Sequence, residues 1–275
     1  MSISAPRYAS APTERLGRTD RALAIVGQQF LNQSTGATWA VVALTYIAVI
    51  LTDALYVLLA SFVGQATSAT FEFAYESPVL PFLLLIVATV VGAGCIAQDL
   101  GSRSIVLFLS RPIKTLDYLG AKMAATGSWI LIATVGPGIV VVVIEAALGT
   151  VSASVALSAA FGFLATGLLA TIFFTGLVVA LSSLTTRPLY AGVATFGLVL
   201  SLYIGVGVVA GITGNSIVRY ADPITNVRSV AQAAFGVSGA HPTDPVASAI
   251  ILLVGGACLA ALAAWRLSRV EVVAE

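Results

Sequence analysis

Few side chains in this sequence carry charge, and the largest group of them lies between residues 99 and 122. Four basic residues, Arg103, Arg111, Lys114 and Lys122, follow Asp99 in this stretch. Such side chains pair with carboxylates or phosphates of a partner, or they face water beside a membrane. Two interpretations therefore stay open: a docking surface for a cytoplasmic partner, or a plain basic loop.

The apolar residues of the same stretch have helical spacing. Ile105, Phe108 and Leu109 occur at i, i+3 and i+4, which places them on one side of a short helix. We expect this helix to end before Pro112, because the proline ring disfavours helical geometry at the residue before it. A long helix is then expected to begin near Thr115, with the Thr115 side chain as its cap.

Asp53 is the only acidic residue well inside an apolar segment. An ionised carboxylate is costly in a bilayer, so Asp53 is expected to face protein or water rather than lipid. It fits two roles, a residue of a transport pathway or dimer interface, or a hydrogen-bonded carboxylic acid. Glu145 lies near the end of another apolar segment and is expected to be solvated.

The sequence lacks the motifs of several enzyme classes. It contains no phosphate-binding loop, no Gly-x-Ser-x-Gly or His-Glu-x-x-His motif and no evident pair of intramembrane carboxylates. Cys95, Cys258 and the only histidine, His241, have no metal-ligand spacing. We therefore predict no catalytic residue, no metal and no cofactor bound by this chain, and any ATP hydrolysis must occur on another chain. Nothing indicates a nucleic-acid partner.

The composition is that of an integral membrane protein. Of the 275 residues, 59% are hydrophobic and 9% are charged, whereas soluble domains average roughly 25% charged residues. Six apolar segments approach the roughly 20 residues that cross a bilayer. These predicted spans are residues 38–63, 78–97, 118–147, 154–182, 188–211 and 246–265. The predicted fold is all-α, with a six-span membrane domain over 38–265.

The distribution of basic residues predicts the orientation. With a cytoplasmic N-terminus, the inner segments hold Arg7, Arg15, Arg18, Arg21, Arg103, Arg111, Lys114, Lys122, Arg187, Arg266 and Arg269, which leaves only Arg219 and Arg228 outside. Because short cytoplasmic loops are rich in Lys and Arg, both termini are expected in the cytoplasm. Residues 1–37 comprise a tail and, over Thr13–Phe30, an amphipathic interface helix, and residues 266–275 form the other tail.

The outer connection over residues 212–245 is too long for a simple turn. Helical spacing after Asp222 and Pro223 predicts a short helix there, either re-entrant in the outer leaflet or lying on the surface. In the fifth predicted span, Gly207 and Gly211 form a small-xxx-small pair, which permits close helix contact within the chain or across a dimer.

The stretch 99–122 resembles the cytoplasmic coupling segment of type-2 ABC transporter permeases. The residues that match in order and spacing are Asp99, Gly101, Leu107, Leu109, Ser110, Arg111, Pro112, Ile113, Lys114, Tyr118, Gly120, Ala121 and Lys122. Departures are Gln98-Asp99 in place of a longer acidic cluster, and Asp117 where a basic or neutral residue is more usual. The six-span layout extends the resemblance over nearly the whole chain.

This resemblance implies a permease subunit of an exporter in the cell membrane. It also implies a second permease subunit, identical or related, and two cytoplasmic ATPase subunits that bind ATP and Mg. Residues 99–117 would dock on the ATPase, with Phe108 and Leu109 as apolar anchors and Arg103, Arg111 and Lys114 as ion-pairing residues. Two competing interpretations are an ATPase-independent transporter or channel, which would need ionisable groups within the spans, and a non-transporting membrane scaffold.

Overall fold

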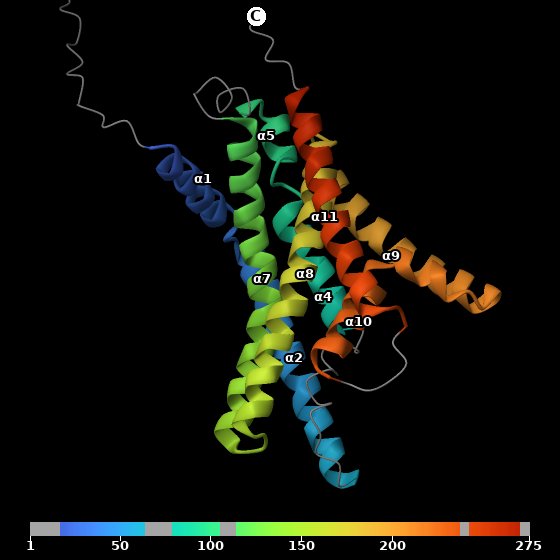
Figure 1. The fold of residues 1–275 in the computed structure, drawn as a ribbon. Coiled ribbons are helices and arrows are strands. Elements are labelled where there is room, and N and C mark those ends of the chain that lie inside the picture. The colour runs from blue at the N-terminus through green and yellow to red at the C-terminus, as the bar shows by residue number, and fades with distance from the viewer. Residues whose placement is uncertain (1–16, 64–78, 105–113, 237–241, 270–275) are drawn as a thin grey trace, which may run out of the picture.

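The computed structural model describes residues 17–63, 79–104, 114–236 and 242–269. Within these ranges every regular element is helical, and six helices are long and apolar enough to cross a membrane. They form an elongated bundle, seen in Figure 1. The spans are α2 (Gly36–Val63), α4 (Val79–Gly92) with α5 (Ala97–Gly101), α7 (Thr115–Leu148), α8 (Ala153–Ser183), α9 (Pro188–Thr213) and α11 (Pro245–Ser268). The all-α, six-span prediction is confirmed.

The helix ends follow local sequence signals. Ser152 caps α8 by accepting a hydrogen bond from the backbone N–H of Val155, at 3.4 Å, and Asp244 caps α11 in the same way. Gly149 and Gly214 follow α7 and α9 with φ of 71° and 66°, the left-handed geometry that glycine adopts without strain. These signals end the spans within a few residues of the predicted limits.

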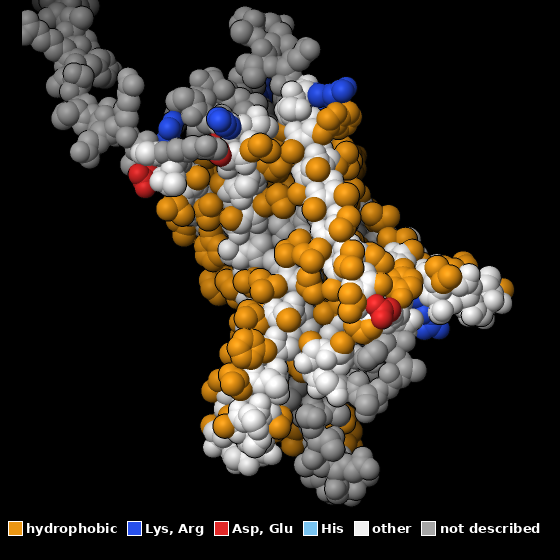
Figure 2. All heavy atoms as spheres, viewed as in Figure 1, with side chains coloured by type: hydrophobic (Ala, Val, Ile, Leu, Met, Phe, Trp, Pro, Cys, Tyr) orange, Lys and Arg blue, Asp and Glu red, His pale blue; other side chains and the backbone are white. Residues whose placement is uncertain are grey.

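Helix α8 lies at the centre of the bundle and packs against α7, α11, α4, α9 and the short helix α10 (Pro223–Ala234). Phe163 and Phe174 of α8 are almost completely buried and belong to the largest apolar cluster. In contrast, most residues of α2, α9 and α11 are not fully buried within the chain, and α9 projects away from the bundle in Figure 1. Figure 2 shows hydrophobic side chains along the sides of the bundle, as expected for a lipid-facing surface.

The second predicted span is not one continuous helix. Helix α4 ends at Gly92, the chain turns through residues 93–96, and α5 restarts at Ala97. The Ser182 side chain of α8 fills the break: its oxygen accepts hydrogen bonds from the N–H groups of Ile96 and Ala97 and donates one to the carbonyl of Ala93. These three bonds replace helical bonds that the turn removes.

Three further local predictions differ from the structure. The helix predicted over Thr13–Phe30 is α1 (Arg18–Gln33) within the described residues, so it ends three residues later; residues 13–16 lie outside the described residues, and its place at a membrane interface stays a prediction. The cap of α7 is Lys114 rather than Thr115, which is the first helical residue, although Asp117 does lie in the first turn. Glu145 is 5% exposed instead of solvated, because α7 turns this side chain toward the protein.

The close packing of α8 and α11 can be tested with a single substitution. A Cβ at Gly176 would lie 2.6 Å from the carbonyl oxygen of Gly256, so Gly176→Ala must push the two backbones apart. We expect a loss of about 1–3 kcal/mol in unfolding free energy, measured by SDS titration in mixed micelles. Gly205→Ala on α9 is the matched control, since its Cβ would meet nothing within 4 Å. Equal effects of the two changes would contradict this packing.

Candidate functional site

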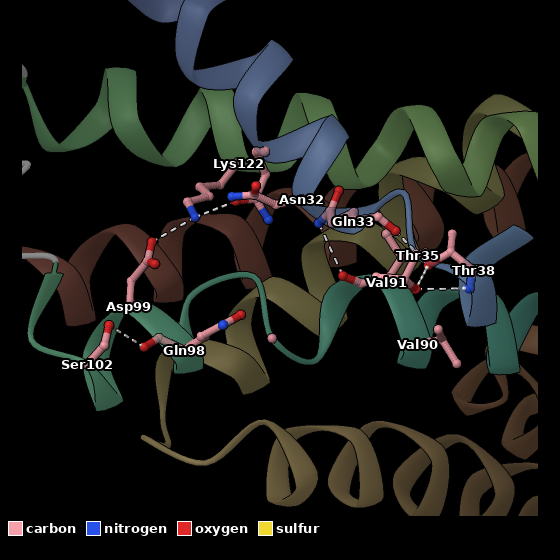
Figure 3. A pocket seen from close by; sticks show the side chains of 12 residues that line it. Asn32, Gln33, Thr35, Thr38, Val90, Val91, Gln98, Asp99, Ser102 and Lys122 are labelled. Carbon is pink, nitrogen blue, oxygen red and sulfur yellow. Dashed lines mark hydrogen bonds and ion pairs between the residues drawn. The ribbon is translucent and has the colours of Figure 1, made fainter.

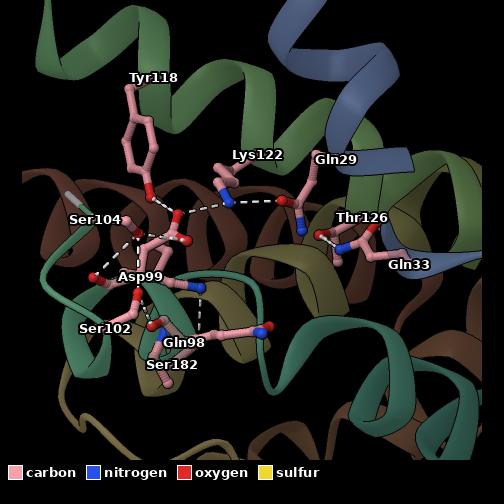
Figure 4. Close-up of polar contacts among 12 residues, drawn as sticks. Gln29, Gln33, Gln98, Asp99, Ser102, Ser104, Tyr118, Lys122, Thr126 and Ser182 are labelled. Atoms are coloured by element: carbon pink, nitrogen blue, oxygen red, sulfur yellow. Dashed lines mark hydrogen bonds and ion pairs between the residues drawn. The ribbon is translucent and has the colours of Figure 1, made fainter. Parts of the chain in front are cut away.

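A polar cluster joins α1, α5 and α7 near one end of the bundle. Lys122 of α7 is central: its Nζ lies 2.7 Å from Oδ2 of Asp99 and donates a 2.6 Å hydrogen bond to Oε1 of Gln29. Tyr118, one helical turn earlier, donates its hydroxyl proton to the same oxygen of Asp99. Figure 4 shows these side chains converging between the three helices. The side chains of Lys122 and Asp99 are 6% and 16% exposed, so this is a buried ion pair.

Helix α1 is held against this cluster by polar and aromatic contacts. Gln33 donates from Nε2 to the carbonyl of Val91 at 3.1 Å and to Oγ1 of Thr126 at 2.8 Å. Phe30 stacks on Trp129 of α7 with ring centroids 4.6 Å apart. Leu23 of the same helix is 67% exposed. The face of α1 that packs is therefore partly polar.

One close approach holds each helix beside the break. A Cβ at Gly101, the last residue of α5, would lie 2.5 Å from the carbonyl oxygen of Thr186, and a Cβ at Gly92, the last residue of α4, would lie 2.3 Å from the Val178 side chain. After α5, Arg103 adopts a φ of 57°, a left-handed conformation that is uncommon for residues other than glycine. The start of segment 99–117 is thus anchored to α8 and to the turn after it.

A polar cavity of about 550 Å³ adjoins the cluster (Figure 3). Amides, hydroxyls and the ion pair line most of it. The lining residues are Gln29, Asn32, Gln33, Thr35, Thr38, Val90, Val91, Gly94, Gln98, Asp99, Ser102 and Lys122.

The predicted coupling residues divide into three groups. Asp99, Tyr118 and Lys122 come together in the buried cluster, while Gly101, Arg103 and Lys114 lie at the ends of the segment. The remaining predicted residues, Phe108, Leu109, Ser110, Arg111 and Pro112, lie outside the described residues, as does the short helix predicted around them.

The outer candidates Asp222 and Pro223 start α10, as the sequence predicted. The Asp222 carboxylate accepts hydrogen bonds from the N–H groups of Ile224 and Thr225, at 3.0 and 3.1 Å, and Pro223 is the first helical residue. Burial raises the pKa of Asp222 above its ordinary value, although these hydrogen bonds and nearby Arg228 favour the charged form. The contacts give Asp222 a capping role, and its role in a pathway stays a prediction.

Asp53 of α2 has a neighbour that the sequence did not reveal. Glu145 on α7 lies near enough to interact electrostatically with it. Two acidic side chains of the spans are therefore neighbours, although they are 92 positions apart in the sequence.

The small-residue pair on α9 makes no contact within the described chain. A Cβ at Gly207 or Gly211 would meet nothing within 4 Å. Close contact across a dimer is the alternative that remains for this pair.

Comparison with known families decides the class of the protein. Residues 23–272 match the sequence model described as "ABC-2 family transporter protein". The chain belongs to the ABC-2 transporter family. No match to a curated protein was found. The ABC-2 family assignment and the six apolar helices make this chain a multi-pass membrane subunit of an ABC transporter, which associates with an ATPase subunit and with membrane lipid.

Proposed function

We propose that this ABC-2 subunit couples ATP hydrolysis on a separate cytoplasmic ATPase to export of a substrate across the cell membrane. The assembly would contain two ATPase subunits, which bind ATP and Mg, and two permease subunits, identical or related. Both termini and segment 99–117 would face the cytoplasm. The family membership supports the proposal, as does the excess of basic residues in the two terminal segments and in segment 99–117.

The observation that carries the proposal is the buried connection between α5 and α7. Asp99 precedes residues 105–113 in the chain, and Tyr118 and Lys122 follow them. Both of these side chains contact Asp99 directly. A push from the ATPase on segment 99–117 would therefore reach α7 and, through the packing of α5 on α8, the centre of the bundle. In this mechanism Asp99, Tyr118 and Lys122 are positioning residues, because they touch each other rather than the partner.

Affinity purification from the native membrane followed by mass spectrometry tests the assembly. A soluble ATPase with a phosphate-binding loop, present in stoichiometric amount, is the expected result. Its absence from a monodisperse preparation would overturn the proposal.

Leu109→Asp tests the docking role of segment 99–117. Placing a carboxylate on the predicted apolar face should reduce recovery of the ATPase at least about tenfold, since a mismatched charge at a docking surface costs more than about 1.4 kcal/mol. Arg111→Glu combined with Pro112→Ala should act in the same direction. The control is Leu184→Asp, which places the same charge on a half-exposed leucine after α8. Unchanged recovery of the ATPase with Leu109→Asp would contradict the docking role.

The proximity of Asp53 and Glu145 favours one second candidate, an ATPase-independent transporter. Such a transporter needs ionisable groups inside its spans, and this pair supplies two. Transport by the reconstituted subunit alone, driven by an ion gradient and abolished by Asp53→Asn, would support this candidate over the ATP-driven one.

A further inference from the structure

The polar cavity is not isolated, because a second, apolar groove of about 690 Å³ begins on the other side of the α4–α5 break. Residues of α4 and α9 form this groove. Its lining comprises Thr89, Val90, Ala93, Gly94, Gln98, Pro188, Leu189, Gly192, Val193, Phe196 and Gly197. Three residues, Val90, Gly94 and Gln98, line both the cavity and the groove. The unwound turn thus joins a hydrogen-bonding cavity to an apolar groove.

The cavity lies at the depth of lipid headgroups. Helix α7 has 34 residues and is about 51 Å long, which exceeds a hydrocarbon core of about 30 Å by about 10 Å at each end. Lys122 is seven residues from the start of α7, about 10 Å along its axis. Trp265 of α11 is half-exposed and lies between Ala263 and Leu267, which pack in one cluster with Tyr118 of α7. Tryptophan is enriched at membrane interfaces, so this level of the bundle fits the headgroup region.

The charges of the cavity select a headgroup without net charge. Among the described residues that line it, the charged side chains are those of Lys122 and Asp99, and they neutralise each other at 2.7 Å. The other polar groups are amides and hydroxyls such as those of Asn32, Gln98 and Thr38, which both donate and accept hydrogen bonds. A zwitterionic headgroup offers both kinds of partner, whereas a headgroup of high net charge would find no free counter-charge among these lining residues.

The groove provides the complementary part of the site. Leu189 and Val193 of α9 are 72% and 62% exposed and line the groove beside α4. Both volumes fall within the roughly 300–1,000 Å³ of typical ligand sites. We propose that the cavity and groove together bind a zwitterionic phospholipid from the adjacent leaflet, with its headgroup in the cavity and an acyl chain in the groove. This site goes beyond the proposed ATPase coupling and does not depend on it.

Gly94 provides a sharp test, because it lines both spaces. A Cβ at Gly94 would lie 3.7 Å from Oε1 of Gln98 and 4.0 Å from Pro188, which is ordinary contact. Gly94→Ala should therefore be tolerated. In Gly94→Phe, the phenylalanine ring should block the connection between the cavity and the groove. Gly120→Phe on α7, where a Cβ meets nothing within 4 Å, is the control for a bulky ring elsewhere.

The probe is a phosphatidylethanolamine with a photoactivatable group on one acyl chain, added to vesicles of phosphatidylethanolamine and phosphatidylcholine that contain the full-length protein. We expect cross-links concentrated at Val193 and Phe196, reduced at least fivefold by Gly94→Phe and unchanged by Gly94→Ala and Gly120→Phe. Labelling at Val254, a lipid-facing residue of α11, should be the same in all variants.

Three results would overturn the inference. In the first, Val193 is labelled no more strongly than Val254. In the second, Gly94→Phe leaves the labelling of Val193 unchanged. In the third, the groove cross-links to a second copy of the chain. Recovery of the ATPase from the same preparations reports on the proposed function separately, so failure of one hypothesis is distinguishable from failure of the other.

Discussion

Lys122→Met is expected to lower the free energy of unfolding by about 3–5 kcal/mol, because it leaves the Asp99 carboxylate buried without its cation. Methionine preserves most of the length of the lysine side chain, so lost packing contributes little. The change also leaves Oε1 of Gln29 without its donor. SDS titration in mixed micelles measures the effect.

A rescue experiment separates the ion pair from a general effect at this position. In Lys122→Met combined with Asp99→Asn, no unpaired charge remains, and the asparagine oxygen still accepts the proton of Tyr118. The double variant should therefore regain most of the lost stability. Lys114→Met, at an exposed position before α7, is the control and should change stability by less than about 0.5 kcal/mol. Additive losses in the double variant would contradict a role for the buried pair.

Hydropathy alone predicted most of the fold. Five of the six spans begin and end within three residues of the predicted limits, because each must hold roughly 20 apolar residues and end in polar or turn-forming sequence. The exception is the second span. Its break depends on Ser182, which is 86 residues from Ile96 in sequence, so no local pattern could reveal it. Gly92 and Gly94 were the only local sign of an irregular helix.

The candidate site was predicted in part. The resemblance selected Asp99, Tyr118 and Lys122, and the structure places all three in one cluster. Their burial was not predicted, because a basic residue near a span end is normally expected to face water. Gln29 and Gln33 were missed, since α1 was analysed for its apolar residues, and it is these amides that contact α7 and α4. The proximity of Asp53 and Glu145 was missed because only tertiary packing brings α2 and α7 together.

Ser182→Ala is expected to have the second large effect, a loss of at least about 2 kcal/mol. Removing this hydroxyl leaves two N–H groups and one carbonyl of the α4–α5 break buried without partners, each at a cost of about 1–3 kcal/mol. Helix α5 is especially sensitive, because the first N–H groups of any helix have no partner within it. Amide exchange at Ile96 and Ala97 should accelerate, which places the damage at the break.

Ser183→Ala provides a matched control for this change. Ser183 is as deeply buried as Ser182, but its hydroxyl only donates to the Ala180 carbonyl of its own helix, at 2.7 Å. Its removal should cost less than about 1 kcal/mol and leave exchange at Ile96 unchanged. Equal losses from the two serines would show that the break does not depend on Ser182. A selective loss would show that one hydroxyl of α8 positions α5, and with it Asp99, for the contact with α7.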